Sequence, residues 1–210
     1  MTVGIKICGL CEVGDAVAAV EAGATAVGLN LIASSKRFIE LPLAAAIVAE
    51  VGAQVRTVVV VADLTAAEIE SIRQRVRPNY VQLHGSESAA LLAAVLPGAY
   101  KAIRIADRGD VAAASEFAGE ELLVDAKVPG ALGGTGTSFD WSLVSELSRQ
   151  RSMWLAGGLT PDNVAEAVRQ VAPYGVDTAS GVEVSGQARR KDPSRMKDFV
   201  QAVRDLEVAS

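Results

Sequence analysis

The chain has 210 residues, of which half are hydrophobic and 21% are charged, and it carries a formal net charge of −5. This length allows one domain with a sizeable buried core, while an acidic chain without a long basic run does not suit nucleic acid. No apolar stretch approaches the roughly 20 residues that span a bilayer, no secretory signal is visible at the N-terminus, and two cysteines are too few for a disulfide scaffold, so we expect a cytoplasmic protein without nucleic-acid or membrane partners.

Short apolar runs alternate with amphipathic stretches along the whole chain. The apolar runs are bounded by turn residues and rich in β-branched side chains, which is typical of buried parallel strands. They predict strands at Gly4–Cys8, Ala26–Leu31, Arg56–Val61, Tyr80–Leu83, Tyr100–Arg104, Leu122–Asp125, Met153–Ala156 and Val176–Ala179. The stretches between them predict helices at Val13–Ala22, Leu43–Val51, Ala66–Val76, Ser88–Leu96, Ala112–Phe117, Trp141–Arg149, Pro161–Val171 and Pro193–Leu206.

Two of these helices carry a recognisable start signal. Thr65 and Glu68 form a potential capping box before the third helix, and Thr160-Pro161 would put a proline in the first turn of the seventh. Eight strand–helix units predict a single-domain (β/α)8 TIM barrel over residues 1–210. A doubly wound open sheet is the alternative architecture.

A barrel would gather the carboxyl ends of all strands at one rim, where active sites of this fold lie. Glycine clusters follow three of the predicted strands, and they are Gly133-Gly134-Thr135-Gly136, Gly157-Gly158 and Ser180-Gly181. Backbone N–H groups of such loops and the Ser180 hydroxyl can bind a phosphate group. A flexible loop or a tight turn would explain any one cluster equally well. The three together favour a small phosphorylated ligand.

Cys8 and Asp125 end the first and sixth predicted strands, where they could serve as base and acid. Each also has a structural explanation, since Cys8 could be a buried core thiol and Asp125 a loop or helix cap. Cys8-Gly9-Leu10-Cys11 is formally a C-x-x-C motif, but His84 is the only histidine and no second ligand pair exists. We therefore expect neither a metal site nor redox chemistry, although oxidation could pair Cys8 with Cys11.

Further polar residues fall at the same predicted rim. Gln82 and His84 close the fourth strand, and Asp177 lies near the end of the eighth. His84 could line a pocket, titrate or cap. Arg37, after the second strand, could grip a substrate carboxylate through its two-pronged guanidinium, or it could be a solvated loop cation.

Taken together, these segments resemble the phosphoribosylanthranilate isomerase family of tryptophan biosynthesis. The matching stretches, in family order, are Lys6-Ile7-Cys8-Gly9-Leu10, Val81 to Glu87 with its Gln-Leu-His-Gly, Gly133 to Trp141, Leu155 to Val164, and Ser180 to Glu183. The resemblance implies an Amadori rearrangement of N-(5-phosphoribosyl)anthranilate to 1-(2-carboxyphenylamino)-1-deoxyribulose 5-phosphate, without metal or organic cofactor.

The resemblance also implies roles for single residues. Cys8 matches the general base, Asp125 the general acid and Arg37 the residue that holds the anthranilate carboxylate. The substrate-binding positions would include Arg37, Gln82, His84, Gly134, Gly157, Gly158, Asp177, Ser180 and Gly181. The chain departs from the family pattern at Cys11, Lys36 and Ala179.

Two other functions remain open at this level. One is a (β/α)8 isomerase or epimerase acting on another phosphorylated sugar, and the other is a barrel that binds a phosphorylated ligand without catalysis. Either a monomer or a homodimer is compatible with the sequence.

Overall fold

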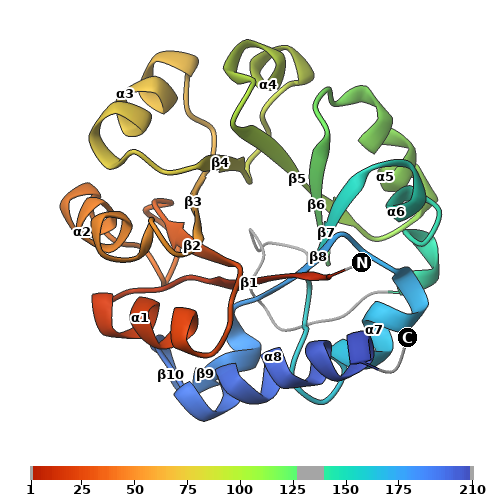
Figure 1. Ribbon diagram of the computed structural model, residues 1–210. Coiled ribbons are helices and arrows are strands. Elements are labelled where there is room, and N and C mark those ends of the chain that lie inside the picture. Colours follow the sequence, from red (N-terminus) through yellow and green to blue (C-terminus); the bar gives the residue numbers. More distant parts are fainter. Residues whose placement is uncertain (1, 127–139, 209–210) are drawn as a thin grey trace.

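The computed structural model describes residues 2–126 and 140–208, and its centre is a closed barrel of eight parallel strands in the order β1 to β8. Helices surround this barrel on the outside (Figure 1). The predicted (β/α)8 fold is therefore confirmed, and the open sheet is excluded. The strands are β1 (Gly4–Cys8), β2 (Ala26–Asn30), β3 (Arg56–Val61), β4 (Tyr80–Leu83), β5 (Ala99–Ile105), β6 (Glu121–Ala126), β7 (Ser152–Leu155) and β8 (Gly175–Thr178).

The helices follow the predicted order, and α3 has the predicted bounds whereas the ends of the others are shifted. They are α1 (Val13–Glu21), α2 (Leu41–Val51), α3 (Ala66–Val76), α4 (Ala89–Val95), α5 (Arg108–Ala113), α6 (Leu147–Gln150), α7 (Val164–Val171) and α8 (Pro193–Val208). The capping box at the start of α3 is present: Thr65 Oγ1 accepts from the backbone N–H of Glu68, whose carboxylate accepts from the Thr65 N–H at 2.8 Å.

Three helix predictions differ from the structure. The helix predicted from Ala112 begins earlier, at Arg108, because the Asp107 carboxylate caps it by accepting from two backbone N–H groups. Pro161 lies in a turn and α7 begins at Val164. The stretch Trp141–Arg149 divides into a 3-10 turn and the short helix α6. A two-stranded hairpin, β9 (Glu183–Val184) and β10 (Gln187–Lys191), was not predicted, since its exposed polar residues lack the alternation of a buried strand.

Each barrel strand has an outer face and an inner face. Outward residues such as Ile5, Ile7, Val27 and Leu29 belong to the large core between barrel and helices. Inward residues form a second, separate cluster, which comprises Ala26, Val58, Tyr100, Ala102, Leu123, Trp154 and Ala156. This alternation follows from the two-residue period of a strand, and it assigns Lys6 and Cys8 to the lumen.

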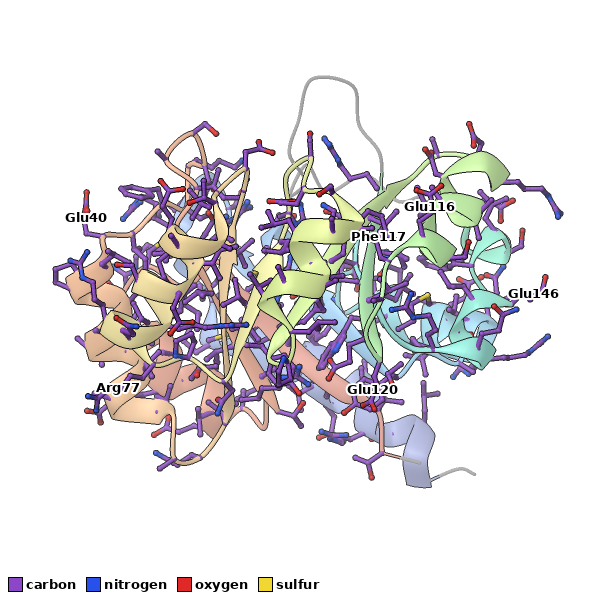
Figure 2. All side chains as sticks on the ribbon, turned by 90° about the horizontal axis from the view of Figure 1, so that it is seen from above. Glu40, Arg77, Glu116, Phe117, Glu120 and Glu146 are labelled. Atoms are coloured by element: carbon purple, nitrogen blue, oxygen red, sulfur yellow. The ribbon has the colours of Figure 1, made fainter. Side chains whose placement is uncertain are left out.

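The two ends of the barrel are distinct, because all eight strands run in the same direction. In the side view of Figure 2, Arg77 and Glu120, which precede β4 and β6, lie toward one end, and Glu40, which precedes α2, lies toward the other. The second end is the carboxyl-terminal rim, to which the strand-end residues Cys8 and Asp125 belong. Among the described residues, no helix is both long and apolar enough to cross a membrane.

Candidate active site

Cys8 occupies the last position of β1, at the rim of the barrel. It is paired in register with Gly28 of β2. A Cβ at Gly28 would lie 2.6 Å from Sγ of Cys8 and 3.1 Å from Cε of Lys6. The glycine therefore leaves the space that the thiol and the end of the lysine side chain share.

Beneath the thiol lies a layer of polar side chains that fills the lumen. Nζ of Lys6 donates to Oδ2 of Asp177 at 2.9 Å and to Oε1 of Gln82 at 3.1 Å. The hydroxyl of Tyr100 donates to the same Gln82 oxygen at 3.0 Å. Branched apolar residues usually dominate the interior of such barrels, so an ion pair in this position marks a site with a chemical task.

The layer continues upward to Asp125 through His84. The side-chain amide nitrogen of Gln82 lies 2.8 Å from Nδ1 of His84, and Nε2 of His84 lies 3.8 Å from Oδ2 of Asp125. The side chains of His84 and Asp125 are each 9% exposed. The structure thus brings together four of the residues predicted for the site, namely Gln82, His84, Asp125 and Asp177.

Arg37 lies on the same rim and is buried, so the alternative of a solvated loop cation is excluded. Its guanidinium binds both carboxylate oxygens of Glu183, with Nη2 donating at 3.1 Å. Nζ of Lys191 also donates to Glu183 at 3.2 Å, and it donates to the carbonyl of Ala179 at 2.8 Å. The hairpin that carries Lys191 therefore fixes the orientation of the arginine.

The loops after β7 and β8 touch each other at the rim. Thr178 Oγ1 donates to the Leu159 carbonyl at 2.7 Å, and a Cβ at Gly181 would lie only 2.0 Å from that carbonyl oxygen. Gly157 and Gly158 have φ values of +91° and +67°, which side chains rarely tolerate. Ser180 and Gly181 begin a 3-10 turn directly after β8. Gly134, with the rest of the segment 127–139, lies outside the described residues.

The charges around Cys8 act on its thiol in both directions. Exclusion of water raises the pKa of Cys8 above its usual value of 9.0, and Asp177 raises it further, while Lys6 and Lys191 lower it. Burial has the opposite effect on an ammonium group and lowers the pKa of Lys191. Burial, the largest single influence, would lower the pKa of Lys6, but Asp177, Cys8 and Tyr100 together outweigh this effect and raise it. The two lysines thus favour the thiolate against the cost of burial.

Cys11, the second cysteine, is buried and its thiol is directed at backbone carbonyls. Its Sγ lies 3.6 Å from the Gly9 carbonyl and 3.5 Å from that of Arg37, and both cysteines are free thiols. Pairing of Cys8 with Cys11 on oxidation stays a prediction.

Sequence reasoning missed four residues of the site, which are Lys6, Tyr100, Glu183 and Lys191. Lys6 shares one face of its strand with Cys8, so the two-residue period of the barrel strands was a usable signal for it. The strand of Tyr100 carries no predicted site residue that could have marked its inward face. Glu183 and Lys191 lie on the unpredicted hairpin, and no local pattern indicated that Glu183 would bind both Arg37 and Lys191. Among the described residues, no cluster of three or more histidine, cysteine or acidic residues could hold a metal ion.

A (β/α)8 barrel with a thiol, a carboxylic acid and glycine-bearing loops at its carboxyl-terminal rim defines a class of enzymes that act on small phosphorylated molecules. Comparison with known proteins narrows this class. The family model for N-(5'-phosphoribosyl)anthranilate isomerase matches residues 5–202. The chain belongs to this family, and it is an isomerase of tryptophan biosynthesis.

Individual relatives agree with this assignment. N-(5'-phosphoribosyl)anthranilate isomerase from Magnetococcus marinus is 41% identical over 204 residues, covering 97% of this chain and 96% of its own. The crystal structure of phosphoribosyl anthranilate isomerase from Thermotoga maritima is 34% identical, with a TM-score of 0.89 over 98% of this chain and 100% of its own. A further phosphoribosyl anthranilate isomerase structure is 32% identical, with a TM-score of 0.84 over 98% of this chain and 100% of its own. It is a complex with reduced 1-(o-carboxyphenylamino)-1-deoxyribulose 5-phosphate.

Proposed function

We propose that Cys8 and Asp125 act as general base and general acid in the rearrangement of N-(5-phosphoribosyl)anthranilate to 1-(2-carboxyphenylamino)-1-deoxyribulose 5-phosphate. The observation that carries this assignment is their common position. Each is the last inward-facing residue of its strand, at the carboxyl-terminal rim. A buried series of contacts from Lys6 through Gln82 and His84 leads from the neighbourhood of Cys8 to Asp125. A general acid and a general base must each come within hydrogen-bond reach of the proton that is transferred, so both groups need to line the same substrate site.

The reaction follows from proton transfers at these two groups. Asp125 protonates the furanose ring oxygen, the bond from that oxygen to C1′ breaks, and the anthranilate nitrogen supplies the electron pair that forms a Schiff base. The thiolate of Cys8 then removes the proton from C2′, and the electrons of that C–H bond form the enolamine. Loss of the proton on the C2′ hydroxyl oxygen and protonation of C1′ give the aminoketose, so the overall change is an isomerisation.

The remaining rim residues would bind the two anionic ends of the substrate. Arg37 would hold the anthranilate carboxylate with the guanidinium edge that Glu183 leaves available. The adjoining loops with Gly157, Gly158, Ser180 and Gly181 would hold the phosphate, and so would Gly134. Asp177 and Gln82 would act from the layer below. Binding energy at the phosphate would keep the reacting carbons in place.

The proposal includes a small phosphorylated substrate, no cofactor, no nucleic-acid or membrane partner, and action in the cytoplasm as a monomer or a homodimer. Light scattering of the purified chain measures its assembly state directly.

Turnover assays of matched variants test the two roles. Conversion of phosphoribosylanthranilate is followed by the loss of its anthranilate fluorescence, with a no-enzyme control for spontaneous hydrolysis. Cys8→Ser and Asp125→Asn should each lower kcat by about 10²- to 10⁴-fold, the usual contribution of a general acid or base. Cys11→Ser, a matched thiol change outside the reacting pair, should retain activity. Full activity in Cys8→Ser or in Asp125→Asn would refute the corresponding role.

A further inference from the structure

His84 is the only histidine of the chain, and both of its ring nitrogens have polar neighbours. Nδ1 lies 2.8 Å from the side-chain amide of Gln82, and Nε2 lies 3.8 Å from Oδ2 of Asp125. A neutral imidazole carries one N–H, and the hydrogen bond made by one nitrogen decides which of the two holds it. The orientation of the Gln82 amide therefore decides what His84 presents to Asp125.

That orientation follows from Lys6. One end of the Gln82 amide lies 3.1 Å from Nζ of Lys6 and 3.0 Å from the hydroxyl of Tyr100. An ammonium group can only donate, so the amide atom that faces it must be the oxygen. The amide nitrogen then faces His84, and because an NH₂ group can only donate, Nδ1 must accept. The single proton of the neutral ring is left on Nε2.

Lys6 is itself held firmly in this orientation. It is fully buried, and its ion pair with Asp177 at 2.9 Å fixes the position of Nζ. Reversal of the Gln82 amide would bring its NH₂ group against the ammonium and leave two donors facing each other in a site closed to water. The ion pair therefore transmits one fixed arrangement of donors through Gln82 to the histidine ring.

We propose that Lys6 and Gln82 lock His84 in its Nε2–H tautomer, so that His84 is a positioning residue whose N–H is directed at the carboxyl group of Asp125. This inference rests on the proposed role of Asp125 as the acid. When Asp125 transfers its proton to the ring oxygen of the substrate, it becomes a carboxylate, and the Nε2–H stabilises that charge while His84 keeps its own proton. Contacts of this kind are commonly long in enzymes without substrate and shorten in the substrate complex.

Nitrogen-15 NMR of the ring reads the tautomer directly, because a chain with one histidine gives one imidazole signal set. At pH 8, where a free imidazole is neutral, the wild type should show a protonated Nε2 and an unprotonated Nδ1, without averaging between the two forms. Gln82→Glu replaces the donor at Nδ1 with an acceptor, so the proton should move to Nδ1. A wild-type signal with the proton on Nδ1, or averaged signals, would overturn the proposal.

Two variants that each remove one donor to the same Gln82 oxygen separate the role of Lys6 from general packing. In Tyr100→Phe the ammonium remains, so the Nε2–H tautomer should persist. In Lys6→Met only the tyrosine hydroxyl remains, which can donate or accept, so the amide can reverse and both tautomers should appear. Loss of the tautomer in Tyr100→Phe would show that Lys6 does not control it. If Lys6→Met does not fold, the wild-type and Gln82→Glu spectra still decide the question.

Kinetics of conservative variants measure the effect on catalysis. His84→Gln keeps an N–H donor and should retain most of kcat, whereas His84→Ala should lower kcat by about tenfold or more, a part of what general acid catalysis supplies. The change in KM should be smaller. Equal kcat values in the two variants would refute the positioning role. If Asp125→Asn remains fully active while the tautomer is as expected, the acid assignment fails and the locked ring stands.

Discussion

Two of the buried lysine–carboxylate pairs among the described residues differ in what surrounds them. Lys6 and Asp177 meet in the lumen, and Lys101 and Glu87 meet outside it, each pair at 2.9 Å. Nζ of Lys101 also donates to the carbonyls of Leu83 and Gly85, while Glu87 accepts from the backbone N–H groups of Gly85 and Asp63. The outer pair therefore holds the loops after β3 and β4.

The inner pair has different neighbours. Among the described residues, Lys6 of this pair donates a hydrogen bond to the Gln82 side chain and shares the space beside Gly28 with the Cys8 side chain. The same kind of ion pair thus supports backbone on the outer face of the barrel and reactive side chains on the inner face. The comparison teaches that burial and distance alone do not indicate function, whereas the identity of the third partner does. The predictions below test this difference.

The largest expected effect comes from removing one ion of the outer pair. Lys101→Met should lower the free energy of unfolding by about 3–5 kcal/mol, because it leaves the charge of Glu87 buried and unpaired. Urea unfolding measures this loss, and kcat of the folded variant should be close to that of wild type. Glu87→Gln, which keeps acceptor capacity for the backbone, is the milder control. A large fall in kcat for Lys101→Met would mean that the outer pair also serves the chemistry.

Gly28→Ala should disturb the lumen with a smaller loss of stability. The added methyl group would lie 2.6 Å from Sγ of Cys8, closer than atoms in contact allow. We expect a loss of about 1–3 kcal/mol, which is typical of overpacking, together with a fall in kcat of at least about tenfold because the thiol is displaced. Gly14→Ala, at a position with nothing within 4 Å, is the matched control. Unchanged turnover in Gly28→Ala would contradict the placement of Cys8 as the base.

Asp177→Asn should make the Cys8 thiol more acidic. Burial raises the pKa of this thiol and Asp177 raises it further, while Lys6 lowers it. The neutral amide removes one charge that disfavours the thiolate, so the pKa should fall. We expect Cys8 to react with iodoacetamide up to about tenfold faster at pH 8, which corresponds to one pKa unit or about 1.4 kcal/mol. In the parent protein the alkylation rate should keep rising with pH beyond 9, because thiolate accumulates only above the raised pKa.

This alkylation experiment uses a Cys11→Ala background, so that Cys8 is the only thiol. Glu87→Gln, the same chemical change in the outer pair, should leave the alkylation rate of Cys8 unchanged. An equal acceleration in both variants would show that loosening of the barrel, rather than local charge, controls the thiol.

Much of this architecture could be predicted from the sequence, since strand positions depend on local apolar runs. β1, β3 and β4 lie where they were predicted, and the capping box of α3 is present. The helix expected at Trp141–Arg149 is broken, because amphipathic spacing does not report where a segment must turn to meet its neighbours. Local signals of this kind predict elements well and their ends less well.

The candidate site shows a sharper limit. Residues at strand ends, such as Cys8 and Asp125, could be proposed from the rim rule of the fold. The partners of these residues come from distant parts of the chain, as in the bonds from Lys6 to Asp177 and from Arg37 to Glu183. Such pairs depend on the closure of the barrel and on an unpredicted hairpin, so one sequence without its three-dimensional contacts does not reveal them.

The smallest expected effect concerns a region far from either ion pair. Thr65→Ala removes the hydroxyl that accepts from the Glu68 N–H at the start of α3 and that donates to its carboxylate at 2.7 Å. Loss of such a cap typically lowers stability by about 1 kcal/mol, which urea unfolding can resolve. Because α3 lies outside the barrel and away from its lumen, kcat, KM and the histidine tautomer should all stay at wild-type values. A change in the His84 spectrum of Thr65→Ala would mean that the lumen responds to outer stability in general, and the division of roles between the two faces would then be wrong.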